Sequence, residues 1–168
     1  MAIENIVMEN TGAGSASETP VQVLLVEDNE ADVRLTVEAF KETTVMSRLR
    51  AVEDGVEALA YLRRQGKYSD AARPDLVLLD LNLPRMDGAE LLAIIKRDPY
   101  LKQIPVVVFT TSSSARDIAK SYALHANCYI TKPVDLNRFL DIVKSIEAFW
   151  FTVVALPTLP DRFFSASS

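Results

Sequence analysis

The sequence is poor in the residues that build disulfides, metal clusters and nucleic-acid interfaces. Its 168 residues include one cysteine, Cys128, and one histidine, His125. A single cysteine excludes an intrachain disulfide, argues against a zinc cluster and fits a reducing, cytoplasmic setting. Lys and Arg number 18 against 23 Asp and Glu, which gives a formal net charge of −5. Because nucleic-acid binding usually leaves a basic footprint, we expect no nucleic-acid partner.

Long apolar segments are also missing. No run approaches the ~20 residues that span a bilayer, and the N-terminus lacks the basic start of a signal peptide, so we expect no membrane association. Residues 11–17 are rich in Thr, Gly, Ala and Ser, and we expect residues 1–20 to be a flexible lead-in. The remaining length suits one domain over residues 21–150, followed by an extension over residues 151–168.

Four short runs rich in Val, Leu or Ile stand out along this domain, at residues 21–26, 76–79, 106–109 and 128–130. They show little alternation, which is typical of strands buried on both faces in a parallel sheet. Residues 47–52 alternate between polar and apolar side chains and therefore predict an edge strand.

Amphipathic helix patterns fill the gaps between these strands. We expect one helix from Asp87-Gly88 to the residues before Pro99, and others over residues 30–42, 54–64, 114–125 and 135–149. Five strand–helix repeats with right-handed crossovers predict an α/β fold with a doubly wound parallel sheet. Ligands of such sheets bind outside the C-terminal ends of the strands.

Polar residues follow these strands at that edge. Glu27 and Asp28 end the first strand and Asp80 the third, and Thr110 and Lys132 follow later strands. Three crowded carboxylates repel one another, and oxygen ligands suit a hard cation such as Mg²⁺. A cation would also make Asp80 a plausible nucleophile toward phosphorus, with Thr110 and Lys132 as donors to phosphoryl oxygens. The set predicts an aspartyl-phosphate site.

These segments resemble the receiver domain of two-component response regulators. The matching pieces are residues 26–29, 80–88, 109–112 and 129–133. The resemblance implies a flavodoxin-like (βα)5 sandwich with a five-stranded parallel sheet of order 2-1-3-4-5. It further implies a single-domain phosphorylation switch rather than an enzyme, which acts in a phosphorelay and takes its phosphoryl group from a sensor histidine kinase.

The same resemblance implies a role for each site residue. Asp80 is the phosphoacceptor, and Glu27, Asp28, Asp80 and the backbone carbonyl of Asn82 hold Mg²⁺. Spacing from Lys132 and Pro105 favours Thr110 over Thr111 as the hydroxyl at the phosphoryl group.

The switch and counter-charge residues follow in the same way. Thr110 shifts on activation and Tyr129 changes rotamer. Lys132 pairs with the phosphoryl oxygens, and Lys132–Pro133 is expected to be a cis peptide.

Two departures from the common receiver pattern narrow the assignment. The first acid is Glu27 rather than Asp, and the segment between Asp28 and Asp80 is long, with the surplus near residues 66–73. This long segment, residues 125–132 and the aromatic tail are similar to the stand-alone regulators of cyanobacterial phytochrome kinases. A phytochrome is therefore the expected partner kinase.

Three other functions remain as alternatives. A haloacid-dehalogenase-like phosphatase also uses a strand-end Asp, but it needs a second Asp where this chain has Asn82. A nucleotide-binding Rossmann domain needs a Gly-rich turn after the first strand, and this chain has Glu27-Asp28-Asn29-Glu30 there. A receiver with a vestigial site could serve as a constitutive docking module.

The C-terminal residues carry more apolar surface than one helix face can bury. Phe139 and Ile142 add to a helix stripe that is already apolar, and the tail adds Phe149, Trp150, Phe151, Val153 and Val154. Surplus apolar surface usually marks an interface, so we expect a homodimer through the last helix and the extension. The 18 residues that follow residue 150 are too few for a DNA-binding or enzymatic output domain, so output is expected to run through protein contacts.

Overall fold

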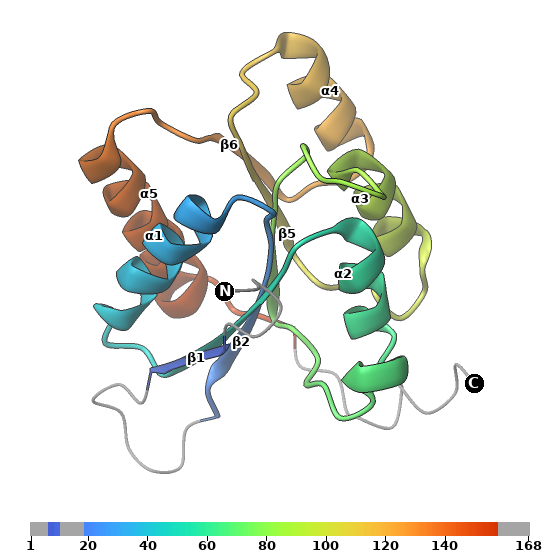
Figure 1. Cartoon of the computed structure of the whole chain (residues 1–168), viewed down its shortest axis with the longest axis horizontal. Coiled ribbons are helices and arrows are strands. Elements are labelled where there is room, and N and C mark those ends of the chain that lie inside the picture. The colour runs from blue at the N-terminus through green and yellow to red at the C-terminus, as the bar shows by residue number, and fades with distance from the viewer. Residues whose placement is uncertain (1–6, 11–18, 158–168) are drawn as a thin grey trace.

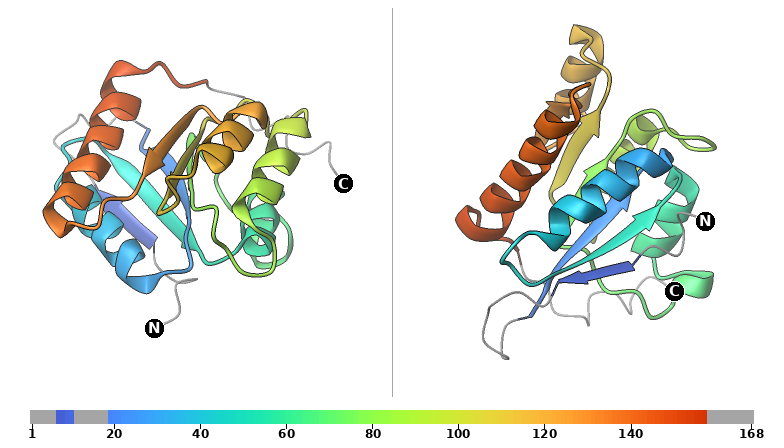
Figure 2. Two further views of the ribbon diagram at one scale, coloured as in Figure 1. Left: turned by 90° about the horizontal axis from the view of Figure 1, so that it is seen from above. Right: turned by 60° about the vertical axis from the view of Figure 1, so that its left-hand side comes forward.

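The protein is built on one twisted sheet with helices on both faces (Figures 1 and 2). The computed structural model describes residues 7–10 and 19–157. The strands are β1 (Val7–Asn10), β2 (Val21–Val26), β3 (Ser47–Val52), β4 (Leu76–Leu79), β5 (Val106–Thr110) and β6 (Cys128–Thr131). Their spatial order is β1-β3-β2-β4-β5-β6. The five strands from β2 to β6 are parallel. Counted from β2 as the first strand, they lie in the predicted order 2-1-3-4-5, which confirms the predicted fold.

Helices α1 and α5 cover one face of the sheet, and α2, α3 and α4 cover the other (Figure 1). Their bounds are α1 Glu30–Lys41, α2 Gly55–Leu62, α3 Gly88–Arg97, α4 Ala115–Ala123 and α5 Leu136–Ala148. A short 3₁₀ turn, η2 (Gly66–Tyr68), follows α2. Among the described residues, no helix is long and apolar enough to cross a bilayer.

Each helix starts where the sequence offers a capping side chain. The caps are Asn29, Asp54, Asp87, Ser114 and Asp135, and each side chain accepts a hydrogen bond from the backbone N–H three residues on. Such a bond satisfies one of the orphan donors at a helix N-terminus. Because these caps follow directly after strand ends or loops, they fix where the chain turns from the sheet into each helix.

Alternate strand residues feed two separate cores. Val23 and Leu25 pack with α1 and α5, whereas Leu24 and Val26 pack with α2 and α3. Strand β4 is buried at all four positions. This explains why the strand runs read as continuously apolar, since both faces of a parallel sheet are covered.

The sheet has one strand more than predicted. Val7–Asn10 pairs with β3 antiparallel, with Val7 opposite Arg50 and Asn10 opposite Ser47. The prediction of a flexible lead-in is therefore wrong for residues 7–10, and β3 is not the edge strand of the described sheet. The physical reason is that the outer side of β3 offers unpaired backbone groups that another strand can satisfy. Residues 1–6 and 11–18 lie outside the described residues.

The end of α5 continues directly into a π-helical turn, η3 (Phe149–Val153). This turn folds back on the core: Trp150 is buried, and the Phe151 ring contacts the Phe40 ring of α1 at 5.8 Å between centroids. Much of the predicted apolar surplus is therefore buried within the chain itself. Phe149 and Val153 stay 52% and 72% exposed.

Candidate functional site

The polar residues predicted to share one edge of the sheet do come together there. Glu27 follows β2, Asp80 follows β4, Thr110 ends β5 and Lys132 follows β6. The order of the parallel strands places these carboxyl ends side by side at the end of the sheet where α1 begins (Figure 1). Glu27, Asp80, Thr110 and Lys132 are all buried.

Glu27, Asp28 and Asp80 form a cluster of carboxylates that could hold a metal ion. Each offers one oxygen, and the three oxygens lie within 4.8 Å of one another. Asp28 is exposed, so the cluster opens to solvent on one side. Oxygen-only donors with room for retained waters fit a hard divalent cation.

Lys132 bridges the acidic residues. Its Nζ lies 2.9 Å from Asp80 Oδ2 and 2.9 Å from Asp32 Oδ2, and it also donates to Glu27 Oε2. Burial alone would lower the pKa of the Lys132 ammonium, but the charges of Glu27 and Asp80 outweigh burial and hold the pKa above its ordinary value. Lys132 is thus a fixed positive charge against the predicted phosphoacceptor.

The two buried carboxyls respond differently to this environment. Burial is the largest influence on Glu27 and raises its pKa to about 8, with Lys132 opposing and Asp80 adding to the increase. Burial would also raise the pKa of Asp80, but contacts with Lys132 and with the N–H of Asn82 (3.1 Å to Oδ1) lower it overall. Asp80 is therefore held as a carboxylate, the form that a nucleophile needs.

Thr110 is fully buried, and its hydroxyl makes no hydrogen bond of normal geometry. It is nevertheless close enough to Asp80 to lower the pKa of that carboxyl. A buried hydroxyl without a full partner is rare and costly, so the position of Thr110 needs an explanation. Thr111 is exposed.

Tyr129 is half-buried and points toward the loop after β5. Its hydroxyl donates to the Ser112 carbonyl at 2.8 Å, and its backbone N–H donates to the Tyr122 hydroxyl at 3.2 Å. Tyr129 is thus tied to the segment that directly follows Thr110. Any rotamer change of Tyr129 must break the bond to Ser112.

The loop after Asp80 is held tightly under the site. A Cβ added to Gly88 would lie 2.2 Å from the Asp80 carbonyl oxygen, so this position accepts only glycine without a backbone shift. The Gly88 N–H donates to the Leu81 carbonyl at 3.0 Å. The glycine lets the start of α3 pack directly against the backbone of Asp80 and Leu81.

The prediction of a cis Lys132–Pro133 peptide is wrong for this structure, because no peptide bond among the described residues is cis. The trans form is the general preference even before proline. With the trans bond, the Lys132 side chain already reaches three carboxylates.

Two polar contacts escaped the sequence analysis. Asp32, in the first turn of α1, is a third partner of Lys132. Its place three residues after the capping residue Asn29 was the available signal, since α1 starts at the same edge of the sheet. Arg85, in the loop after Asp80, pairs with the buried Asp54 at 2.9 Å and ties that loop to α2. Nothing in the sequence spacing joins those two residues.

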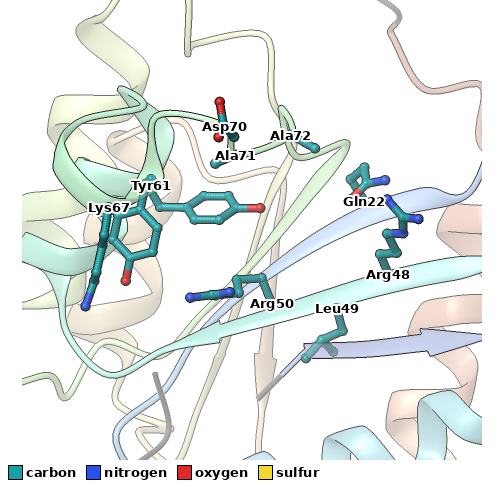
Figure 3. Close-up of a pocket in the computed structure, with 10 residues that line it drawn as sticks. Gln22, Arg48, Leu49, Arg50, Tyr61, Lys67, Asp70, Ala71 and Ala72 are labelled. Carbon is teal, nitrogen blue, oxygen red and sulfur yellow. The ribbon is translucent and has the colours of Figure 1, made fainter. Parts of the chain in front are cut away.

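A pocket of about 310 Å³ lies elsewhere, beside the amino-terminal half of β3 (Figure 3). Arg48 and Arg50 of β3 and Tyr61 of α2 line it. It contains none of the strand-end carboxylates. A second cavity of about 490 Å³ adjoins the site instead, lined among others by Asp28, Asn82 and Asp87.

Comparison with known proteins identifies close relatives. Residues 23–144 match the family described as the response regulator receiver domain. Response regulator Rcp1 from Synechocystis sp. (strain PCC 6803) is 50% identical over 141 residues, which are 84% of this chain and 96% of Rcp1.

Two solved structures share the fold at high similarity. The crystal structure of the phosphorylated cyanobacterial phytochrome response regulator RcpA has a TM-score of 0.81 and 54% identity, covering 83% of this chain and 100% of that chain. The Mn(2+)-bound form of response regulator Rcp1 has a TM-score of 0.81 and 50% identity, with the same coverage.

Proposed function

This chain belongs to the response regulator receiver domain family, and from that premise we propose that it is a phosphorylation switch whose acceptor is Asp80. The observation that carries the proposal is the environment of Asp80. The buried Asp80 carboxylate faces the ammonium of Lys132 and the buried Thr110 hydroxyl, which has no hydrogen bond of normal geometry. Two further acids, Glu27 and Asp28, lie at the same edge of the sheet. The donor is a phosphohistidine on a sensor histidine kinase.

In this reaction an oxygen of Asp80 attacks the phosphorus, and the bond between phosphorus and the histidine nitrogen breaks. The electron pair of that bond returns to the imidazole, so an acyl phosphate forms on Asp80. Lys132 turns from the Asp80 carboxylate toward the phosphoryl oxygens, while Asp32 and Glu27 remain as its partners. The Thr110 hydroxyl donates to another phosphoryl oxygen and gains the partner it lacks.

We assign the metal as Mg²⁺, held by Glu27, Asp28, Asp80 and the backbone carbonyl of Asn82. The spacing and oxygen chemistry of the three carboxylates support this choice. The relative Rcp1 has a Mn(2+)-bound form, which is consistent with a divalent site here. Bound at this place, the ion supplies positive charge to the phosphoryl oxygens.

The switch runs from Thr110 to Tyr129. When Thr110 moves toward the phosphoryl group, the backbone of residues 110–112 moves with it, and the Ser112 carbonyl that holds Tyr129 is displaced. Two discrete positions of Tyr129 then report the phosphorylation state at the surface.

The partner kinase is a phytochrome, as the similarity to the cyanobacterial phytochrome response regulator RcpA supports. We place the protein in the cytoplasm, because its single cysteine fits a reducing compartment. We further propose that output runs through protein contacts, including a homodimer on α5 and the extension over residues 151–168, of which residues 158–168 lie outside the described residues. The exposed Phe149 and Val153 support an interface there. Sedimentation equilibrium at micromolar concentration, with and without a phosphoryl mimic, must show dimer; monomer in both conditions contradicts this part.

The acceptor assignment is tested by labelling the protein with a small phosphodonor in Mg²⁺. Wild type must gain one phosphoryl group by intact-mass measurement, and the Asp80→Asn variant must gain none. Asp87→Asn is a matched control, since Asp87 caps α3 and asparagine caps a helix equally well. Equal labelling of Asp80→Asn and wild type would refute the assignment.

A further inference from the structure

Glu147, near the end of α5, is a buried acid that the phosphorylation site does not use. It is 2% exposed, and neither carboxylate oxygen makes a hydrogen bond of normal geometry. Its neighbours along the helix, Val143, Ile146 and Trp150, belong to the apolar core. Buried carboxyls are normally paired or hydrogen-bonded, so this one needs an explanation.

The surroundings of Glu147 supply no cation of its own. Glu147 lines a cavity of about 280 Å³, together with Glu42 to Val45, Lys144, Ala148 and Thr152. Lys144, a cation that lines this cavity, is bound to Glu42 at 2.5 Å. From α1, Lys41 is paired with Glu38 at 3.0 Å, and η3 carries no titratable side chain.

Burial, the negative charge of Glu42 and the helix dipole of α1 therefore disfavour the ionised form of Glu147. Burial is the largest and raises the pKa of Glu147 to about 7, with Thr43 and Lys144 opposing it and Glu42 adding to it. The C-terminal end of α1, beside this cavity, is also the negative end of its helix dipole. The ionised form of Glu147 therefore has a lower free energy in water than in its buried position.

The element that lies next to Glu147 along the chain is η3, which lines the same cavity through Thr152. It follows α5 directly and is held by the buried Trp150, by the Phe151–Phe40 ring contact and by the Val154 N–H, which donates to the Phe149 carbonyl at 2.9 Å. These few contacts make the segment a local unit that can open without unfolding the sheet.

We propose that Glu147 is a proton-controlled latch, which holds η3 against α1 when protonated and loosens it when ionised. The sign follows from the raised pKa. The stabilisation is fully present below the ordinary value of 4.5 and is lost as the pH rises through about 7. The latch stands on the geometry of α1, α5 and η3 and does not depend on phosphorylation or on the proposed dimer.

Amide hydrogen exchange of Val154, measured by NMR on the full chain, tests the latch. If the opened form has an ordinary carboxyl pKa of 4.5 and the docked form about 7, the protection factor falls about 20-fold between about pH 5.5 and 7.5. The Glu147→Gln variant, of the same shape but without charge, must show no such fall. Asp141→Asn, an exposed acid on the same helix, is the matched control and must keep it.

The proposal is overturned if wild-type protection stays constant over this range or if Glu147→Gln shows the same fall. Should the variant not fold, the carboxyl carbon-13 shift of Glu147 in wild type decides the question. A titration midpoint near 7 supports the latch, and a midpoint near 4.5 refutes it.

Discussion

Replacing Thr110 by valine should make the unphosphorylated protein more stable while removing part of its response. Valine keeps the branched shape that the buried site accommodates and deletes only the hydroxyl. That hydroxyl is fully buried and has no hydrogen bond of normal geometry. A buried polar group without a partner costs roughly 1–3 kcal/mol relative to an apolar isostere.

The weak interaction between Thr110 and Asp80 offsets part of this gain, so we expect the lower end of the range, about 1 kcal/mol. For a domain of this size that corresponds to a melting temperature higher by roughly 2–4 °C. Thermal unfolding of the unphosphorylated protein, followed by circular dichroism, gives this difference directly.

Thr111→Val is the matched control, because Thr111 is exposed and its change should stay within about 0.5 kcal/mol. Loss of stability in Thr110→Val would show that the hydroxyl is satisfied in the resting protein. It would then not be a donor reserved for the phosphoryl group, and the reasoning would be wrong.

Other perturbations test the remaining contacts. Lys132→Met leaves three acids without their shared ammonium and should lower the free energy of unfolding in urea by roughly 3 kcal/mol, as for one broken buried pair. Because a cation can replace the lost charge, added Mg²⁺ should stabilise this variant more than wild type, and an equal effect on both contradicts the account. Gly88→Ala forces the Asp80 carbonyl aside and should cost about 1–3 kcal/mol by the same measurement, with an unchanged midpoint as the contrary result. Tyr129→Phe removes the bond to Ser112 and should cost roughly 0.5–1.5 kcal/mol while speeding exchange of amides in residues 111–114, and unchanged exchange there would disconnect Tyr129 from the switch.

The sequence predicted the sheet and the site well where each residue's position follows from one strand. Asp80 and Lys132 were identifiable because Asp80 directly follows the buried strand β4 and Lys132 directly follows β6, and the order of parallel strands brings their ends together. The starts of the helices could be predicted equally well, since Asp54, Asp87 and Asp135 are strong capping residues.

The predictions that failed or fell short depend on contacts between distant segments. Val7–Asn10 carries no strong strand pattern and becomes a strand because β3 offers unpaired backbone groups. The apolar tail predicted surplus surface, but the π-helical turn folds Trp150 and Phe151 back onto the core. Glu147 lies at the end of the apolar stripe of α5, and nothing in the sequence pattern predicted that its buried carboxyl would lack a hydrogen bond of normal geometry.

The central claim is that phosphoryl transfer ends on Asp80, and mapping the acyl phosphate tests it most directly. The protein is labelled by a phosphorylated phytochrome kinase in Mg²⁺, reduced with borohydride, digested and sequenced by mass spectrometry. Because borohydride converts an aspartyl phosphate to homoserine, we expect homoserine at position 80 and unmodified Asp28 and Asp87. Homoserine at another position, or labelled protein with an unmodified Asp80, would contradict the account.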